Sequence, residues 1–169
     1  RKIRLWDLSD GSSRVFVGPN SSLVTTRFTE TSFIASGYKC GTIRYINSED
    51  SRQSRVFEAR DGPIDGFYPL HDMTFLVWSE RIACYEFVEF RQRLLFAYAG
   101  HTRKVTVVRP FAGNYLSGSA DRTVHVWGTD TPEMTILKLK AHKSGILALE
   151  PLDDHRFVTA GNDRTINFW

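Results

Sequence analysis

Two stretches near the C-terminal end of the chain share one pattern: residues 116–127 read LSGSADRTVHVW, and residues 158–169 read VTAGNDRTINFW. Both contain Asp-Arg-Thr, and in both a tryptophan follows six residues after the aspartate. The two tryptophans, Trp127 and Trp169, are 42 residues apart. A match of this length at this spacing indicates an internal repeat, and such a repeat constrains the whole fold.

Weaker copies of the repeat extend toward the N-terminus. Residues 34–46 read IASGYKCGTIRYI, residues 75–85 read FLVWSERIACY, and residues 3–7 (IRLWD) form the end of a further copy. The positions equivalent to the tryptophans are 6, 46, 85, 127 and 169, so the steps are 40, 39, 42 and 42 residues. A period of about 40–45 residues is typical of a propeller blade built from four strands.

Within one period the sequence predicts short strands separated by turns. In the last copy, residues 145–150, 156–160 and 165–169 are strand-like, and clusters of Lys, Ser, Asp, Asn and Gly separate them. The best helix candidate is residues 87–98 (FVEFRQRLLFAY). The repeat places a strand near residues 93–97, so we predict a loop followed by a strand there. The fold class is therefore expected to be all-β.

These motifs resemble the WD40 repeat over essentially the whole chain, strongly in residues 99–127 and 140–169 and in degenerate form in residues 13–46 and 54–85. The resemblance implies a WD40-type β-propeller, in which each antiparallel blade has strands a to d and the sequence repeat runs d-a-b-c. We expect about four four-stranded blades, which form a partial propeller over residues 1–169. Its parts are a leading strand stub at 1–12 and repeats at about 13–46, 54–85, 93–127 and 135–169.

On this alignment the chain begins and ends inside a blade. Propellers close with about 4–8 blades, and the WD40 resemblance implies rings of seven or eight. We therefore expect a fragment of a seven- or eight-bladed ring, with a closed four-bladed ring as the alternative.

His101, Ser117 and Asp121 are an imidazole, a hydroxyl and a carboxylate within one repeat, and these are the parts of a nucleophilic triad. A catalytic triad does not usually occur twice in tandem, and the next repeat carries an equivalent set. The WD40 resemblance implies instead two buried structural tetrads, in which a tryptophan N–H completes each network. We therefore expect no enzyme activity and no catalytic residue. The tetrad residues are His101, Ser117, Asp121 and Trp127, then His142, Thr159, Asp163 and Trp169.

Two of the four repeats lack the tetrad. Pro19 and Arg60 stand near the histidine position, and Cys40 and roughly Ser79 or Glu80 stand near the aspartate position. We expect apolar packing to hold those blades instead.

The composition argues against several classes of function. The formal net charge is +3, and acidic and basic residues are interspersed, so nothing resembles a basic arm or an acidic tail. The two cysteines are too few for a disulfide framework or a zinc site, and no dinucleotide-binding or Walker A glycine motif occurs. We expect no cofactor, no metal and no small-molecule substrate.

The sequence also bears on location. The longest apolar run that we count, residues 94–99, has six residues, whereas a membrane helix needs about 20, so we expect no membrane partner. No signal peptide opens the chain, and sparse cysteines fit a reducing compartment. We expect a cytoplasmic or nuclear protein.

The WD40 resemblance places the d–a and b–c loops on one face, where loops on a rigid scaffold would meet partners. We expect a non-catalytic scaffold that binds other proteins, including acidic or phosphorylated segments, because arginine pairs well with carboxylate and phosphate. The alternative is a nucleic-acid or ribonucleoprotein-associated propeller that uses the same basic face. The residues predicted for this face are Lys39, Arg60, Arg103, Lys104, Arg122, Lys143, Asn162 and Arg164.

Overall fold

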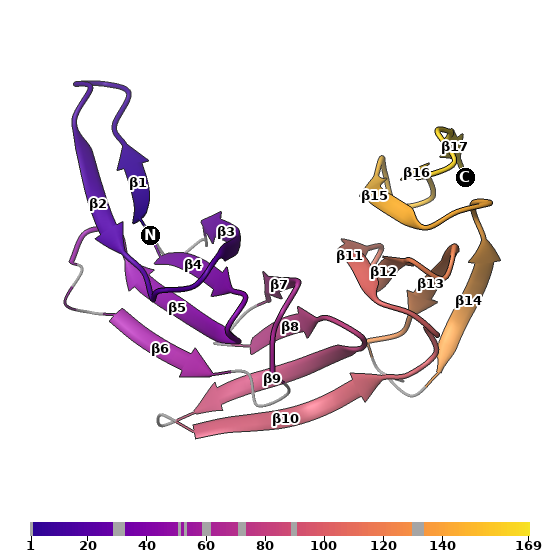
Figure 1. Cartoon of the computed structure of the whole chain (residues 1–169), viewed down its shortest axis with the longest axis horizontal. Helices are drawn as coiled ribbons and strands as arrows, with labels where there is room; N and C mark the ends of the chain where they lie inside the picture. The colour runs from indigo at the N-terminus through magenta and orange to yellow at the C-terminus, as the bar shows by residue number, and fades with distance from the viewer. Residues whose placement is uncertain are drawn as a thin grey trace. The chain divides into compact units, whose positions relative to one another are not determined.

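The computed structural model of the chain describes residues 2–28, 33–50, 52, 54–58, 62–70, 74–88, 91–129 and 134–169. Within these residues the secondary structure consists of seventeen β-strands and contains no helix (Figure 1). The strands form five antiparallel sheets, and every pairing joins strands that are consecutive in the chain. The prediction of an all-β fold built from propeller-type sheets is therefore confirmed.

The first two sheets come from the N-terminal part of the chain. Sheet I pairs β1 (Lys2–Trp6) with β2 (Ser13–Val17). The strands of sheet II, in spatial order, are β3 (Leu23–Phe28), β4 (Phe33–Tyr38), β5 (Thr42–Asn47) and β6 (Ser54–Glu58).

Two further four-stranded sheets and a three-stranded sheet follow. Sheet III contains β7 (Gly66–Pro69), β8 (Thr74–Trp78), β9 (Ile82–Val88) and β10 (Arg91–Tyr98). Sheet IV contains β11 (Val105–Phe111), β12 (Asn114–Ser119), β13 (Thr123–Trp127) and β14 (Thr135–Lys140). Sheet V contains β15 (Ile146–Pro151), β16 (Phe157–Gly161) and β17 (Ile166–Phe168).

The segment with the best helical pattern, residues 87–98, is extended. Its C-terminal part is β10, which confirms the strand predicted near residues 93–97. Phe87 and Val88, which we expected in a loop, are the last residues of β9. Antiparallel pairing of β9 with β10 satisfies the backbone of both strands, so sheet formation outweighs the local helical pattern.

The chain divides into two compact units, residues 1–64 and residues 65–169. In the first unit, sheet I packs on sheet II through a small apolar cluster. Phe16 of sheet I and Ile34 and Ile46 of sheet II are buried there, and Ile3 and Leu5 cover them. The second unit holds sheets III, IV and V.

Sheet IV is covered on both faces within the second unit. On one face Val105, Val108 and Trp127 pack against Leu76 and Tyr98 of sheet III. The other face packs against sheet V in a second cluster, whose main members are Val107, Leu116, Val124 and Val126 with Ile146, Leu149 and Phe157. Full burial of one such side chain contributes about 1.5–3 kcal/mol, so these interfaces give sheet IV a rigid position.

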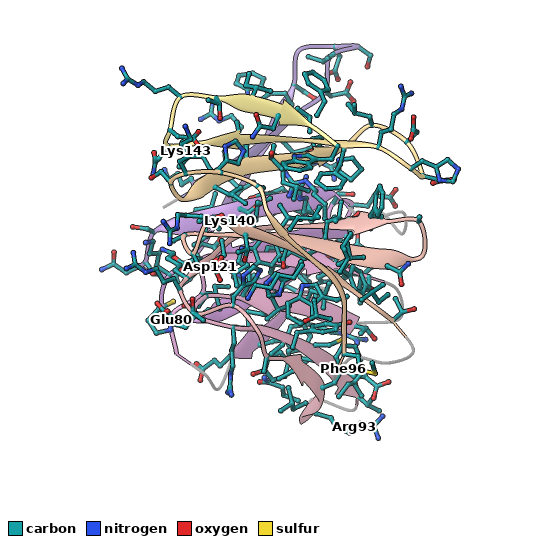
Figure 2. All side chains as sticks on the ribbon, turned by 90° about the vertical axis from the view of Figure 1, so that its right-hand side faces the viewer. Glu80, Arg93, Phe96, Asp121, Lys140 and Lys143 are labelled. Atoms are coloured by element: carbon teal, nitrogen blue, oxygen red, sulfur yellow. The ribbon has the colours of Figure 1, made fainter. Side chains whose placement is uncertain are left out.

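This stacking brings the connections β10–β11, β12–β13 and β14–β15 to one end of the sheets. Figure 2 shows Asp121 and Lys143 at that end, and Arg93 and Phe96 of β10 at the opposite end. Among the described residues there is no helix that could span a membrane.

Candidate partner-binding groove

The first predicted tetrad forms a continuous hydrogen-bond chain in sheet IV. Trp127 Nε1 donates to Ser117 Oγ at 2.7 Å, and Ser117 Oγ lies 2.7 Å from His101 Nε2. His101 Nδ1 lies 2.9 Å from a carboxylate oxygen of Asp121. Since the indole is only a donor, Ser117 Oγ accepts from it and uses its own hydrogen toward His101 Nε2. His101 Nδ1 therefore carries the imidazole hydrogen and donates a hydrogen bond to the Asp121 carboxylate.

The second predicted tetrad repeats this geometry in sheet V. Trp169 Nε1 donates to Thr159 Oγ1 at 2.9 Å, and Thr159 Oγ1 lies 2.8 Å from His142 Nε2. His142 Nδ1 lies 3.0 Å from Asp163. The hydroxyl of Thr159 thus replaces that of Ser117, and it accepts a hydrogen bond from the tryptophan and bonds the histidine in the same way.

The first tetrad holds a neutral imidazole beside an ionised carboxylate. Burial alone would raise the pKa of Asp121, but hydrogen bonds from Thr123, from the Thr102 amide and from His101 outweigh burial and hold that pKa well below its usual range. Burial lowers the pKa of His101, although Asp121 opposes that shift. The side chains of His101 and Asp121 are 3% and 6% exposed, so this charge distribution is shielded from water.

Each tetrad carboxylate also holds the loop that follows its histidine. The Thr102 amide donates to Asp121 at 2.9 Å, and the Lys143 amide donates to Asp163 at 2.7 Å. The hydrogen bond from the Thr165 hydroxyl is the main reason why the pKa of Asp163 is low. Desolvation opposes this shift, and the hydrogen bond from the Lys143 amide adds to it. The two carboxylates therefore fix the backbone of the β10–β11 and β14–β15 connections.

Neither hydroxyl is placed to act as a nucleophile. The Ser117 residue is fully buried and its oxygen already accepts from Trp127, and Thr159 is 1% exposed and accepts from Trp169. A nucleophile must reach the carbonyl carbon that it attacks, and these oxygens are sealed between sheets. The arrangement is suited to holding strands and loops together.

His125 lies beside the first tetrad without joining it. Its ring stacks on His101 with centroids 4.0 Å apart and planes at 24°, and both of its nitrogens are buried without a hydrogen-bond partner. Burial lowers the pKa of His125 to about 4, and the nearby His101 adds to the effect.

The ligand atoms of His101, Asp121 and His125 all lie within 4.8 Å of one another. Both nitrogens of His101 already bond tetrad partners, however, and stacked imidazoles direct their lone pairs nearly parallel instead of toward a shared point. We therefore do not assign a metal site to this cluster.

The degenerate repeats replace the tetrad in two different ways. In sheet II the position of the tetrad serine is occupied by Ser36, because Ser36 pairs with Arg44 in the same register in which Ser117 pairs with His125. The Ser36 hydroxyl is fully buried and has no hydrogen-bond partner. In sheet III the equivalent position is apolar: Val77 pairs with Ala83. Cys40, near the aspartate position of sheet II, bonds Thr42 at 3.1 Å instead of reaching a histidine.

A groove with a volume of about 360 Å³ opens at the loop end of sheet IV. It lies among the β10–β11, β12–β13 and β14–β15 connections, near Asp121 and Lys143 in Figure 2. The residues that line it are Thr102, Arg103, Ala120, Asp121, Arg122, Lys143, Ser144 and Gly145. The groove is thus lined by three exposed cations, Arg103, Arg122 and Lys143, which come from three separate loops. The carboxylate of Asp121 also lines it, and this carboxylate already accepts hydrogen bonds within the tetrad.

Hydrogen bonds between neighbouring connections keep these loops together. The Ser119 hydroxyl bonds the carbonyls of Arg103 and Lys104 at 3.0 and 2.9 Å, and the Ala120 amide donates to the Lys104 carbonyl at 2.9 Å. The same bond recurs in sheet V, where the Asn162 amide donates to the carbonyl of Gly145 at 2.9 Å. The groove walls are therefore tied to the ends of the strands.

Arg122 has a left-handed backbone with φ of 76°, and Arg164 in the equivalent turn of sheet V has φ of 64°. The corresponding residue of sheet II is Gly41, with φ of 90°. Glycine adopts this region without steric cost, whereas a residue with Cβ does not. Two arginines therefore occupy turn positions where the backbone would favour glycine.

The other residues predicted for the partner face do not line the groove. Lys104 forms an ion pair with Asp65 at 2.7 Å, so its charge is already compensated. Asn162 and Arg164 are exposed in the β16–β17 turn. Lys39 is exposed in the β4–β5 turn of the first unit, and Arg60 lies outside the described residues.

Sequence reasoning did not single out the threonines of this site. Thr123 and Thr165 donate their hydroxyls to the tetrad aspartates at 2.6 and 2.7 Å. The sequence did contain a pattern that could have identified them, because both threonines belong to the repeated Asp-Arg-Thr. Thr102 lines the groove, and nothing in the local sequence distinguishes it from an ordinary loop threonine.

Comparison with known proteins agrees with this geometry. The family model described as "WD domain, G-beta repeat" matches residues 92–128 and 133–169. The Ubiquitin fusion degradation protein 3 homolog of Caenorhabditis elegans is 38% identical over 73 residues, which are 41% of this chain and 8% of that protein. WD repeat-containing protein 1 of Mus musculus is 25% identical over 144 residues, which are 80% of this chain and 24% of that protein.

The chain spans a quarter or less of the length of these curated relatives. Among solved structures, that of U3-55K is similar with a TM-score of 0.78 at 24% identity, covering 92% of this chain and 51% of that chain. This likeness shows the fold. The two segments that match the WD-repeat model contain the two tetrads, and sheets II and III have the same strand order as sheet IV, so the chain contains WD40 repeats.

Proposed function

We propose that this chain is a non-catalytic scaffold that binds acidic segments of partner proteins in the groove at the loop end of sheet IV. WD40 propellers are generally non-enzymatic interaction scaffolds. The observation that carries the proposal is the convergence of Arg103, Arg122 and Lys143 from three loops around one groove. In the part of the chain that the structure describes, none of these three side chains forms an ion pair, so their charge is available to a partner.

The groove also has the rigidity that a recognition site needs. Its loops are held by tetrad carboxylates and by hydrogen bonds between the connections, so little conformational entropy is lost when a partner binds. Both cysteines are free thiols, which supports our proposal of a cytoplasmic or nuclear location.

The proposal is tested by placing a photo-crosslinking residue at Ser144 in the groove and, as a matched control, at Asp154 in the β15–β16 turn, which lies at the other end of the strands. We expect protein partners to crosslink from position 144 and not from position 154. The double charge reversal Arg103→Glu and Lys143→Glu should abolish the crosslinks, whereas Arg93→Glu at the far end of β10 should preserve them. Equal crosslinking from the two positions would refute the proposal.

The same experiment addresses a nucleic-acid partner. Crosslinked material that is removed by nuclease, with binding that weakens steeply as salt is added, would favour the alternative of a nucleic-acid-associated propeller. Material that is removed only by protease favours the scaffold function.

A further inference from the structure

We propose that β14 is a second interaction surface of this chain, at which an extended, acidic segment of a partner protein adds a further strand to sheet IV. The surface lies on the outer strand of the sheet and not in the groove between the loops. It follows from three features of β14: a free backbone edge, exposed apolar side chains, and two lysines without ion-pair partners.

The backbone of β14 has one free edge. The spatial order of sheet IV makes β14 its outermost strand, and among the described residues β14 pairs only with β13 (Figure 1). In an antiparallel edge strand, alternate residues direct their N–H and C=O groups away from the neighbouring strand. These groups can bond the backbone of an incoming strand, and such main-chain bonds supply the affinity of strand addition.

The outer strands of sheets II and III are less suited to this pairing than β14. The register shift between β13 and β14 lies at the start of β14, and regular pairing follows from Leu137 to Lys140. In β10 the register shifts between Leu94 and Phe96, in the middle of the strand, and such irregularities oppose edge-to-edge pairing. The outer strand β6 carries exposed charges of both signs, Arg55 and Glu58, whereas β14 carries charges of one sign.

Apolar side chains of β14 remain open to solvent. Ile136 is 57% exposed and Leu137 is 46% exposed, although Leu139 packs against the cluster between sheets IV and V. An added strand would lie about 4.8 Å from β14 and would cover both side chains. Because apolar pairs across neighbouring strands stabilise a sheet, the partner segment should carry apolar as well as acidic residues.

The lysines of β14 determine the charge of the partner. Lys138 pairs with His125 and Lys140 with Thr123, so the two lysines lie on the same face of the sheet. Both are exposed, and neither forms an ion pair in the part of the chain that the structure describes. Carboxylates at alternate positions of an added strand would lie beside both lysines, and opposite charges on neighbouring strands stabilise their pairing.

The same lysines favour an acidic partner over a second copy of this chain. Residues 135–140 read TILKLK and contain no acidic residue, so two paired β14 strands would leave the lysines of both copies without carboxylates. Lysine on an edge strand is one of the means by which proteins prevent sheets from pairing with one another. A segment with an acidic residue at every second position removes this obstacle, because its carboxylates neutralise the lysines.

The test measures binding of the full chain to a short, labelled peptide in which glutamate and valine alternate, by fluorescence anisotropy. We expect this peptide to bind at least about tenfold more tightly than the same peptide with lysine in place of glutamate. N-methylation of its central amides keeps every side chain but removes backbone donors, so it should abolish binding. Hydrogen exchange of residues 135–140 should slow when the unmodified peptide is bound.

The double variant Lys138→Glu and Lys140→Glu should lose the glutamate peptide and bind the lysine peptide instead. Such a reversal of preference cannot result from misfolding, because a misfolded chain would bind neither peptide selectively. Arg55→Glu is the matched control, since Arg55 is an exposed cation on the outer strand of sheet II, and it should leave both affinities unchanged.

Several results would overturn the inference. Equal binding of the two peptides, or full binding after N-methylation, would show that strand addition with charge pairing does not occur at β14. Loss of binding in Arg103→Glu with Lys143→Glu, but not in the β14 double variant, would place the peptide in the groove. A dimer of the chain alone, in which residues 135–140 already exchange slowly, would assign the edge to a second copy.

Discussion

Ser117 and Ser36 occupy the same register position in sheets IV and II, but their hydroxyls have opposite surroundings. Ser117 Oγ accepts from Trp127 and bonds His101. Ser36 has lost both partners, because Ile46 stands at the tryptophan position and Pro19 near the histidine position. Comparing Ser117 with Ser36 therefore distinguishes the contribution of the tetrad hydrogen bonds to stability from the contribution of a small buried side chain.

We predict opposite effects of alanine at these two positions. Ser117→Ala leaves the Trp127 N–H and a His101 nitrogen buried without partners, so the free energy of unfolding should fall by about 1–3 kcal/mol. Ser36→Ala removes a buried hydroxyl that has no partner, so stability should stay constant or rise by up to about 1 kcal/mol. Urea unfolding of both variants measures the difference. Equal losses would show that the tetrad contributes nothing beyond packing.

At the scale of elements, the packing of sheet IV on sheet V depends on Gly118 in β12. A Cβ atom added there would lie 2.7 Å from Ile146 Cγ2 and 3.0 Å from Val107 Cγ1, both inside the apolar cluster between the two sheets. Sheet V has Ala160 at the equivalent register position, where its partner Ile166 is 66% exposed. The absence of a side chain at position 118 is thus a requirement of sheet packing.

Gly118→Ala should destabilise the protein by about 1–3 kcal/mol, because an added methyl group in a packed core forces its neighbours to move. The loss should be smaller in an Ile146→Ala background, since that change removes the nearest atom. A double-mutant cycle from urea unfolding measures the coupling. Strictly additive losses would contradict the proposed contact.

The hairpins show how closely the elements follow the sequence repeat. Gly118 pairs with Val124 and Ala160 with Ile166, so six residues separate the paired positions. In β8–β9, Trp78 pairs with Ile82 only four residues later. This turn is thus two residues shorter than the turns that carry Asp121 in sheet IV and Asp163 in sheet V, and its residues 79–81 include no aspartate.

At the scale of the whole molecule, stability should depend on pH through His125, whose two ring nitrogens are buried without a hydrogen-bond partner. His125 is 1% exposed, and its pKa in the native state is about 4 against about 6.5 in an unfolded chain. Between these values the unfolded chain binds the proton that the native state excludes. The free energy of unfolding should therefore fall as the pH drops from 6.5 toward 4, and rise again as the pH is restored.

The expected loss between pH 7 and pH 5 is about 1–2 kcal/mol, measured by urea unfolding at the two pH values. His125→Asn should remove most of this loss, because Asn167 at the equivalent position of β17 donates to the Ala141 carbonyl at 2.8 Å without titrating. Below pH 4, Asp121 should add a second loss, since its native pKa is depressed and the unfolded carboxylate takes up the proton first. An unchanged pH profile in His125→Asn would exclude His125 as the cause.

What the sequence alone determines is the repeat and everything that depends on local spacing. The period of about 40 residues, the strand and turn alternation and the membership of both tetrads follow from residues at fixed offsets along the chain. Hydrogen bonding between such residues is set by strand register, and register follows from the spacing of apolar and turn residues.

Only the tertiary structure decides which charges are available and which residues share a surface. Lys104 and Arg103 are neighbours in the sequence, yet Lys104 pairs with Asp65 while Arg103 lines the groove. The groove itself joins residues from 102 to 145, and the burial of His125 depends on a ring contributed by the β10–β11 loop. Such features arise from segments that are distant in the chain and are brought together by the packing of sheets, so no local pattern encodes them.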